Sequence, residues 1–231
     1  GSDTYYFGRG DGQDRILDAN VDNDGGIDTL RFGPGITPDD IIFLGVENGA
    51  IRLTIAGSSD RLTIEGMGNN ENNYIDRVDN VIEQFVFADG TIWDAAEIFA
   101  RATQGTEGND RIEFGVWFER TLTISGGKGD DTLITGNGDA TFVFDRGDGR
   151  DTIEVPNPWN SVDTLRFGAG ITAADIALTV KGDDLVIRLR GSEDDRVTIK
   201  GGGSIYGEDI DQIQFADGTL WDYTTLRSHI V

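Results

Sequence analysis

Apolar and polar residues alternate in two separate parts of the chain. Apolar side chains occupy every second position of residues 51–55 and 62–64, on either side of a Gly-containing turn at residues 57–60. The same pattern returns at residues 185–189 and 197–199, around a turn at residues 191–195. A period of two between such turns predicts β-hairpins with one buried face. Each is followed by a second predicted hairpin, which turns at residues 88–90 and 216–218.

Short helices are predicted between these hairpins from N-cap signals. Thr37 and Thr172 each precede an Asp by three residues, which is the spacing of a capping box. Asp94 and Glu97 predict a helix that ends near Ala102, and Asp222 is expected to cap its counterpart. Trp93 and Trp221 recur at matching positions, so we expect both in the core.

Two long segments of the chain match each other, which makes it an internal duplication. The run Asp28-Thr-Leu-Arg-Phe-Gly returns at Asp163, and Phe87-Ala-Asp-Gly-Thr returns at Phe215. Upstream, Arg9-Gly-Asp-Gly parallels Arg146-Gly-Asp-Gly. The chain therefore has two copies of one β-rich unit, with an extra stretch at about residues 104–140 between them.

Composition adds a strong negative charge. The 231 residues carry 42 Asp+Glu against 19 Lys+Arg, a net charge of −23, and 33 Gly. This charge repels phosphate backbones, so we expect no nucleic-acid partner. No apolar run reaches the ~18 residues of a spanning helix, so we expect no membrane insertion. The absence of Cys excludes disulfides and thiol chemistry, and the single His disfavours a His-built zinc site.

Many of the acids sit beside Gly in turns, which predicts calcium. Carboxylates and carbonyls in turns are hard oxygen ligands, which select Ca²⁺ over transition metals. The nonapeptide G-G-x-G-x-D-x-U-x is matched at every fixed position by residues 126–134. Residues 105–113 and 146–154 each depart at one position, and residues 135–143 have Ala140 in place of the ligand Asp. Asp and Gly as simple turn formers explain any single turn, but not the repeated set.

These nonapeptides resemble those of RTX proteins, and the two long units resemble the haemolysin-type calcium-binding protein related domain. The resemblance implies an all-β fold, a calcium-binding parallel β-roll between two β-rich hairpin units with short capped helices. The expected domains are a first RTX-associated unit at residues 1–103, the β-roll at 104–154 and a second unit at 155–231. It also implies a calcium-binding structural module of a large secreted bacterial protein, which leaves by type I secretion and folds and rigidifies on extracellular Ca²⁺.

We expect calcium along one edge of the β-roll. Asp110, Asp131 and Asp151 are 21 and 20 residues apart, rather than the 18 of two ideal nonapeptides. One ion is predicted between loops 105–110 and 126–131, and another between loops 126–131 and 146–151, with Asp131 touching both. The candidate ligands of these loops are the carboxylates of Asp110, Asp131 and Asp151, the carbonyls of residues such as Gly105, Glu107, Gly126, Lys128 and Arg146, and Asp148.

A separate motif precedes the first long repeat. Asn20, Asp22, Asp24 and Asp28 fit the first half of the calcium loop D-x-[DN]-x-[DN]-G, but Arg31 stands where that loop needs its bidentate Glu. A calcium site and a plain Asx-rich turn are both open here. The second copy lacks this loop.

Two other functions remain open. One is a calcium-stabilised carbohydrate-binding or adhesion module that binds a polysaccharide or cell-surface glycan, with Trp159, Trp117 and Tyr74 as candidate stacking residues. Core packing is the alternative for Trp117 and Trp159. The other is a glycosidase with paired carboxylates, which we disfavour because nearly all acids lie in repeated turns or caps. We therefore expect no enzyme.

Overall fold

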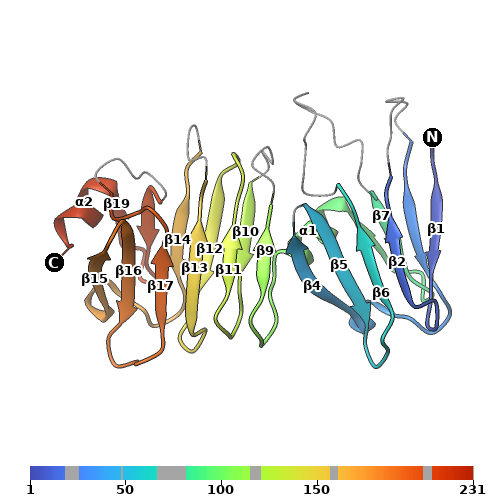
Figure 1. Ribbon diagram of the computed structural model, residues 1–231, viewed down its shortest axis with the longest axis horizontal. Coiled ribbons are helices and arrows are strands. Elements are labelled where there is room, and N and C mark those ends of the chain that lie inside the picture. Colours follow the sequence, from blue (N-terminus) through green and yellow to red (C-terminus); the bar gives the residue numbers. More distant parts are fainter. Residues whose placement is uncertain are drawn as a thin grey trace. The chain divides into compact units, whose positions relative to one another are not determined.

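The computed structural model describes residues 1–18, 26–47, 49–66, 82–114, 121–156, 161–204 and 210–230. The chain divides into two compact units, Gly1–Ala102 and Thr103–Val231. Each unit consists almost entirely of short strands, which are divided between two sheets (Figure 1). Within the described residues, no helix is long and apolar enough to cross a bilayer.

The first unit has one sheet of order β1-β3-β7-β8 and a second of order β4-β5-β6-β2. The pairs β1–β3, β3–β7 and β2–β6 are parallel, whereas β4–β5, β5–β6 and β7–β8 are antiparallel hairpins. The strands are β1 (Thr4–Phe7), β2 (Gln13–Ile16), β3 (Thr29–Phe32), β4 (Ile41–Glu47), β5 (Ala50–Ile55), β6 (Arg61–Ile64), β7 (Gln84–Val86) and β8 (Ile92–Asp94).

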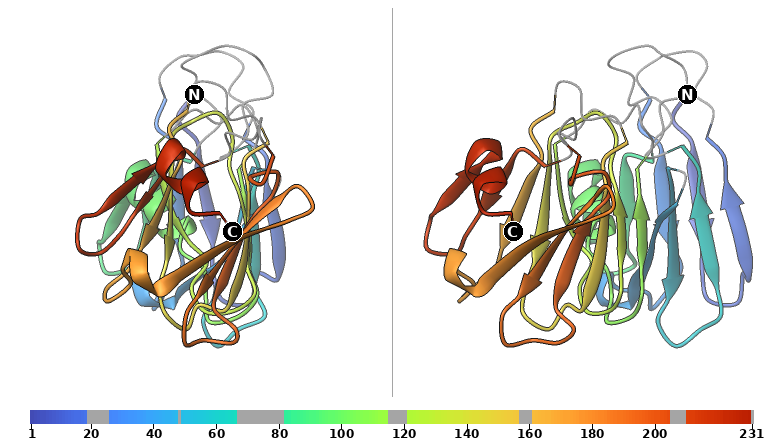
Figure 2. Two further views of the ribbon diagram at one scale, coloured as in Figure 1. Left: turned by 90° about the vertical axis from the view of Figure 1, so that its left-hand side faces the viewer. Right: turned by 60° about the vertical axis from the view of Figure 1, so that its left-hand side comes forward.

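The second unit repeats this topology and adds strands before it. One sheet has the order β10-β12-β14-β18-β19, and strands β15-β16-β17-β13-β11-β9 follow one another in the other. The two sheets face each other as layers (Figure 2). The strands are β9 (Arg111–Glu113), β10 (Leu122–Ser125), β11 (Thr132–Ile134), β12 (Ala140–Phe144), β13 (Arg150–Glu154), β14 (Thr164–Phe167), β15 (Ile176–Lys181), β16 (Asp184–Leu189), β17 (Arg196–Ile199), β18 (Gln212–Gln214) and β19 (Leu220–Asp222).

The strand-by-strand alternation produces the core. In β13, for example, Asp151 and Ile153 face inward, whereas Arg150, Thr152 and Glu154 are less buried. A short strand can form a core with only a few inward residues, because neighbouring strands stack their apolar side chains between the two sheets. The predicted all-β fold with a parallel roll is therefore confirmed, and so are the four predicted hairpins, β5–β6, β7–β8, β16–β17 and β18–β19.

The predicted caps are also present. Asp40 accepts a hydrogen bond from Thr37 N at 2.8 Å, and Asp175 accepts one from Thr172 N at 2.9 Å. These boxes begin short 3-10 helices, and Asp94 and Asp222 cap α-helices. The helices are η1 (Pro38–Asp40), α1 (Ala95–Ala102), η2 (Ala173–Asp175) and α2 (Tyr223–Ser228).

The recurring tryptophans belong to the core, as predicted. Trp93 and Trp221 are buried and meet Phe87 and Phe215 edge to face, with ring centroids 4.6 Å and 5.1 Å apart. His229 is exposed at the C-cap of α2, and its ring stacks on Trp221.

Candidate calcium-binding loops

Three of the predicted calcium loops form one stack in the second unit. They precede β9, β11 and β13, which are neighbouring parallel strands in register. The loops lie at the lower ends of these strands in Figure 1. The Asp spacings of 21 and 20 residues therefore do not disturb the stack, because the additional residues lie elsewhere in each coil.

The loops approach one another so closely that only glycine fits. A Cβ on Gly105 would lie 1.8 Å from the carbonyl oxygen of Gly126, and one on Gly126 would lie 2.2 Å from Asp131 Oδ2. Gly129 has a φ of +133°, and a Cβ on it would lie 2.7 Å from the carbonyl oxygen of Gly108. The nonapeptide glycines thus let the backbones of adjacent loops approach closely, and Gly126 also leaves room for the Asp131 carboxylate of its own loop.

The ligand Asp residues are linked in a regular ladder. Asp131 Oδ1 accepts a hydrogen bond from Asp110 N at 2.7 Å, and Asp151 Oδ1 accepts one from Asp131 N at 3.2 Å. Asp110 Oδ2 accepts from Thr106 N and Oγ1 within its own loop. The carboxylates of Asp131 and Asp151 therefore each lie against the preceding loop, whereas that of Asp110 bonds within its own loop.

Burial without a compensating cation perturbs these carboxylates. Asp131 and Asp151 are 1% and 2% exposed, and Asp131 Oδ2 has no hydrogen-bond partner. Burial raises the pKa of Asp131 to about 6 and that of Asp151 to about 8, and the neighbouring acids add to both shifts. A buried, unpaired carboxylate oxygen is costly, and a cation beside it removes this cost.

Backbone carbonyls supply the other oxygens of the stack. The five whose carbonyls were predicted as ligands accept no backbone hydrogen bond from another described residue: Gly105, Glu107, Gly126, Lys128 and Arg146. In contrast, the carbonyls of Thr106, Gly129 and Asp148 bond to the adjacent loop. Among the described residues, no three His, Cys, Asp or Glu side chains gather around one point. Calcium takes about 6–8 oxygens, including carbonyls, so these loops fit it through carbonyls with about one carboxylate from each loop.

The side chains of the other predicted residues serve the loops in other ways. Lys128 Nζ pairs with Glu107 at 2.7 Å and so joins the first two loops. Arg146 pairs with Asp175 at 3.1 Å. The buried carboxylate of Asp148 accepts a hydrogen bond from Asp145 N at 2.6 Å, within its own turn.

The stack ends at the turn between β16 and β17. Asp195 of this turn accepts a hydrogen bond from Gly147 N at 3.1 Å. The first unit repeats the arrangement, because Asp60 accepts from Gly10 N and Gly12 N at 2.9 Å. A carboxylate of the same chain therefore closes each Gly-Asp-Gly turn.

A second carboxylate ladder runs along the opposite ends of the strands. In the first unit, Asp28 accepts from Asp3 N at 2.7 Å, and Glu83 accepts from Asp28 N at 2.5 Å. In the second unit, Asp163 accepts a hydrogen bond from Ala140 N at 2.9 Å. Because position 140 is Ala rather than Asp, the backbone donor is present there but the carboxylate is absent.

The two copies differ at the centre of this ladder. Asp163 is fully buried, and its Oδ2 accepts a hydrogen bond from Ser161 Oγ at 2.9 Å. Asp28 is 1% exposed, its Oδ2 has no hydrogen-bond partner among the described residues, and Gly26 occupies the position of Ser161. The first copy therefore contains a buried carboxylate oxygen that the second copy satisfies internally.

Two acids that interact with Asp28, Asp18 and Glu83, were not among the predicted site residues. Burial is the main cause that raises the pKa of Asp18 and of Glu83, and the charge of Asp28 contributes to both. Asp18 accepts a hydrogen bond from Tyr5 Oη, and burial raises the pKa of Tyr5 to about 12. An alignment of the copies contains the signal, because Tyr5 and Asp18 stand opposite the apolar residues Phe142 and Val155.

Six predicted site residues lie outside the described residues. They are Asn20, Asp22 and Asp24 of the first-copy loop, and the candidate stacking residues Tyr74, Trp117 and Trp159.

Comparison with known proteins agrees with the duplication. The profile of the haemolysin-type calcium binding protein related domain matches residues 51–97 and 184–225. Each match includes both predicted hairpins of one copy and continues to the start of the following helix.

Individual relatives match less of their own length. The iron-regulated protein FrpA of Neisseria meningitidis serogroup C is 29% identical over 127 residues, which are 55% of this chain and 11% of that protein. The chain thus spans about a tenth of this curated relative. Among solved structures, the extracellular lipase LipA from Serratia marcescens aligns over 92% of this chain and 38% of its own, at 19% identity and a TM-score of 0.32.

Calcium, predicted from the turn composition, is the cofactor that the matched domain implies. Residues 51–97 and 184–225, one region in each copy, are thus similar to the haemolysin-type calcium binding protein related domain, and this similarity supports a calcium-binding module of the RTX type.

Proposed function

We propose that this chain is a non-catalytic structural module of a larger secreted bacterial protein, exported by type I secretion, which becomes rigid when it meets extracellular calcium. The observation that carries this proposal is the unpaired, buried Oδ2 of Asp131 in the central loop of the stack. Extracellular calcium modules bind at about 10⁻⁴ to 10⁻³ M, so such a module is calcium-free inside a cell and loaded outside.

The chain's own residues explain why folding would depend on the ion. In its absence, the carboxylates of Asp131 and Asp151 are buried next to each other, and the surrounding carbonyls lack donors. Bound calcium supplies positive charge and oxygen coordination between adjacent loops. At about ten times its Kd, each ion adds about 1.4 kcal/mol to the free energy of unfolding. Binding energy of this kind is also folding energy.

We further propose the ligand assignment of the stack. Asp110, Asp131 and Asp151 would contribute carboxylates, and the carbonyls left without backbone donors would complete two sites. The ladder through Asp131 supports a shared central role for that residue, since it contacts the loop before it and the loop after it. The carboxylate of Asp148 is engaged in its own turn, so this residue would contribute little.

The first test removes the central carboxylate. Asp131→Ala is expected to lower the calcium stoichiometry by at least one and to shift the far-UV circular dichroism midpoint to higher calcium. Isothermal calorimetry after chelation counts the ions. Asp130→Ala is the matched control, because its side chain is exposed in the same loop. An unchanged stoichiometry in Asp131→Ala would refute the assignment.

A second site is proposed around Asp28 in the first copy, where the sequence motif also placed a candidate. Asp28→Asn is expected to remove one bound ion, because this oxygen has no internal partner. Asp163→Asn, the same substitution at the equivalent position, is expected to leave the ion count unchanged, because both oxygens of Asp163 are satisfied. Equal ion counts in Asp28→Asn and the parent protein would contradict a site at Asp28.

A further inference from the structure

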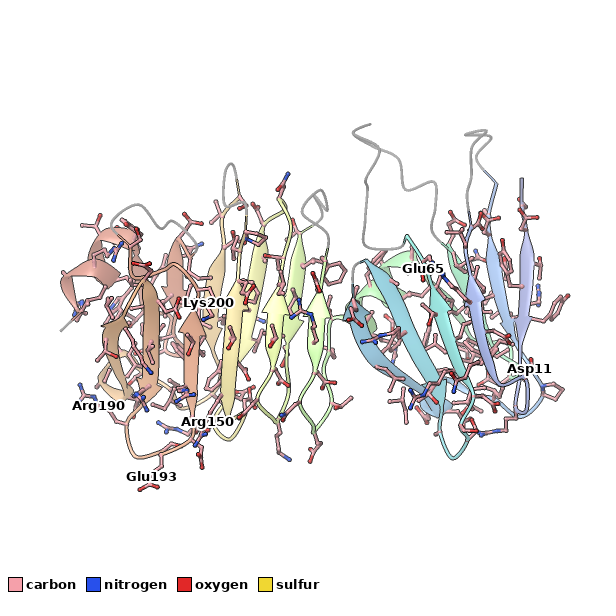
Figure 3. All side chains as sticks on the ribbon, in the orientation of Figure 1. Asp11, Glu65, Arg150, Arg190, Glu193 and Lys200 are labelled. Carbon is pink, nitrogen blue, oxygen red and sulfur yellow. The ribbon has the colours of Figure 1, made fainter. Side chains whose placement is uncertain are left out.

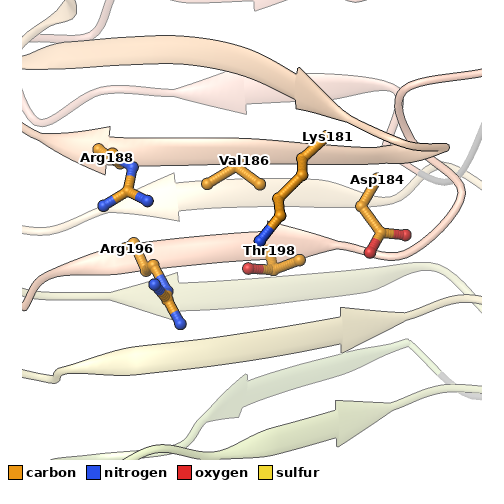
Figure 4. Close-up of a pocket in the computed structure, with 6 residues that line it drawn as sticks. All are labelled: Lys181, Asp184, Val186, Arg188, Arg196 and Thr198. Atoms are coloured by element: carbon orange, nitrogen blue, oxygen red, sulfur yellow. The ribbon is translucent and has the colours of Figure 1, made fainter.

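We propose that the outer face of strands β15, β16 and β17 binds the carboxylate of an acidic sugar. The site is a hollow of about 190 Å³ lined by Lys181, Asp184, Val186, Arg188, Arg196 and Thr198 (Figure 4). It is separate from the calcium loops, and the proposal does not depend on the assignment of calcium ligands.

Three cations line the hollow, and the charge of one of them, Lys181, helps to lower the pKa of Asp184. Arg188 and Arg196 lie directly opposite each other on antiparallel strands. Neither they nor Lys181 forms an ion pair with another described residue. Like charges directly opposite on a sheet destabilise it, so the pair costs stability that an anion between the two guanidinium groups would restore.

The cationic row continues onto the next strand. Arg150 of β13 is the parallel neighbour of Arg196, and it pairs with Asp194. Arg150 lies toward the lower edge of the sheet in Figure 3. The free guanidinium groups are therefore those over the hollow, while the one beside it is already neutralised.

The other end of the hollow is suited to hydroxyl groups. Asp184 accepts hydrogen bonds from Lys200 Nζ at 2.9 Å and Gly201 N at 3.2 Å, and it lies across the hollow from the two arginines (Figure 4). Thr198 offers a hydroxyl group, and Val186 provides an apolar surface. A phosphate dianion would meet the charge of Asp184. A sugar acid would place its carboxylate at the arginines and its hydroxyl groups at Asp184 and Thr198.

The first copy keeps Arg61 in place of Arg196 but has lost the opposed pair of arginines on the same face. By strand register, Thr54 stands in place of Arg188, and Arg52 in place of Val186. Arg52 is neutralised by Glu47 at 2.7 Å. Since the two copies share their fold, the unpaired cations of the second copy are not a requirement of that fold.

The net charge of −23 does not prevent local anion binding. At physiological ionic strength, exposed charges beyond about 8 Å are largely screened, so the three cations and Asp184 that line the hollow dominate its potential.

The test is an NMR titration of the full chain in saturating calcium with glucuronate. We expect saturable shifts of the Val186 and Thr198 amides. Glucose is the neutral comparison, and it should cause little change. Arg188→Gln and Arg196→Gln should each weaken binding about tenfold, since each removes a charge-assisted hydrogen-bonding group. Arg166→Gln removes the same charge from the exposed position of β14 and should leave the affinity for glucuronate unchanged.

Several results would overturn the proposal. They are an absence of saturable shifts, equal binding of glucose, tighter binding of inorganic phosphate or of poly-glutamate than of glucuronate, and unchanged affinity in both arginine variants. Calcium stoichiometry and circular dichroism of each variant should match the parent protein. A calcium defect without a change in sugar binding would concern the loops alone.

Discussion

The residue just before each inward-facing strand carries much of this protein's chemistry. Asp131, Asp28 and Asp163 stand at this position, Asp151 is the second residue of β13, and each of the four accepts a backbone hydrogen bond from the preceding coil. Their environments differ in whether the second oxygen is satisfied. Asp163 is satisfied by Ser161, whereas Asp131 and Asp28 are not, which is why the latter two are assigned to calcium.

Asp163 gives a pH prediction at this scale. Burial raises its pKa to about 6, so the folded protein binds a proton more tightly than the unfolded chain. Its contribution to stability is therefore complete below about pH 4 and is lost as pH rises through about 6. Between about pH 4 and pH 7 the parent protein should therefore lose on the order of 2 kcal/mol of its free energy of unfolding. Asp163→Asn should abolish this loss.

Urea unfolding of both proteins in excess calcium measures this difference. Calcium keeps the loop carboxylates loaded at the higher pH values, so the comparison isolates Asp163. Parallel stability curves for Asp163→Asn and the parent protein would show that Asp163 does not titrate in this range.

At the scale of elements, each β-rich unit is closed by one hairpin turn. The turn between β16 and β17 packs Asp195 onto the Gly-Asp-Gly loop before β13, and the turn between β5 and β6 does the same with Asp60. An ion pair reinforces each contact, Arg146–Asp175 in one copy and Arg9–Asp40 in the other. The hairpin thus ends the stack of loops without a further calcium loop.

Asp195→Ala is expected to destabilise the protein by about 1–3 kcal/mol, because the buried carboxylate of Asp195 joins the hairpin turn to Gly147 N. Thermal unfolding in calcium gives the change in free energy. Glu193→Ala is the control, since Glu193 is exposed at the tip of the same turn (Figure 3) and should change stability by less than about 0.5 kcal/mol. Equal effects of the two substitutions would exclude the bridging role of Asp195.

For the whole molecule, the dominant quantity is the net charge of −23. Self-repulsion of this size opposes the compact state, and it acts on both units. Monovalent salt screens it without entering the loops, whereas calcium both screens it and occupies specific sites. The two effects can therefore be separated.

We predict that raising sodium chloride from about 0.01 M to 0.15 M in chelator increases Tm by a few degrees, because the Debye length falls from about 30 Å to about 8 Å. About 5 mM calcium chloride should increase Tm by more than sodium or magnesium chloride at the same ionic strength. Circular dichroism melting curves test this. If matched magnesium chloride stabilised the chain as strongly as calcium, charge screening would explain the effect without specific sites.

The amino-acid sequence by itself determined the repeat, the hairpins, the caps, the tryptophan core and the nonapeptide loops. These features follow from local rules, since period-two patterns, Gly turns and Asp caps act over a few residues. The tertiary structure alone decided which oxygens are buried and unpaired. Asp28 and Asp163 occur in the same sequence context, Asp-Thr-Leu-Arg-Phe, yet only a contact with Ser161 two residues upstream satisfies one of them. Glu83 and the opposed pair of Arg188 and Arg196 likewise became visible only when strand pairing placed distant or facing residues together, because pairing depends on register across the whole sheet.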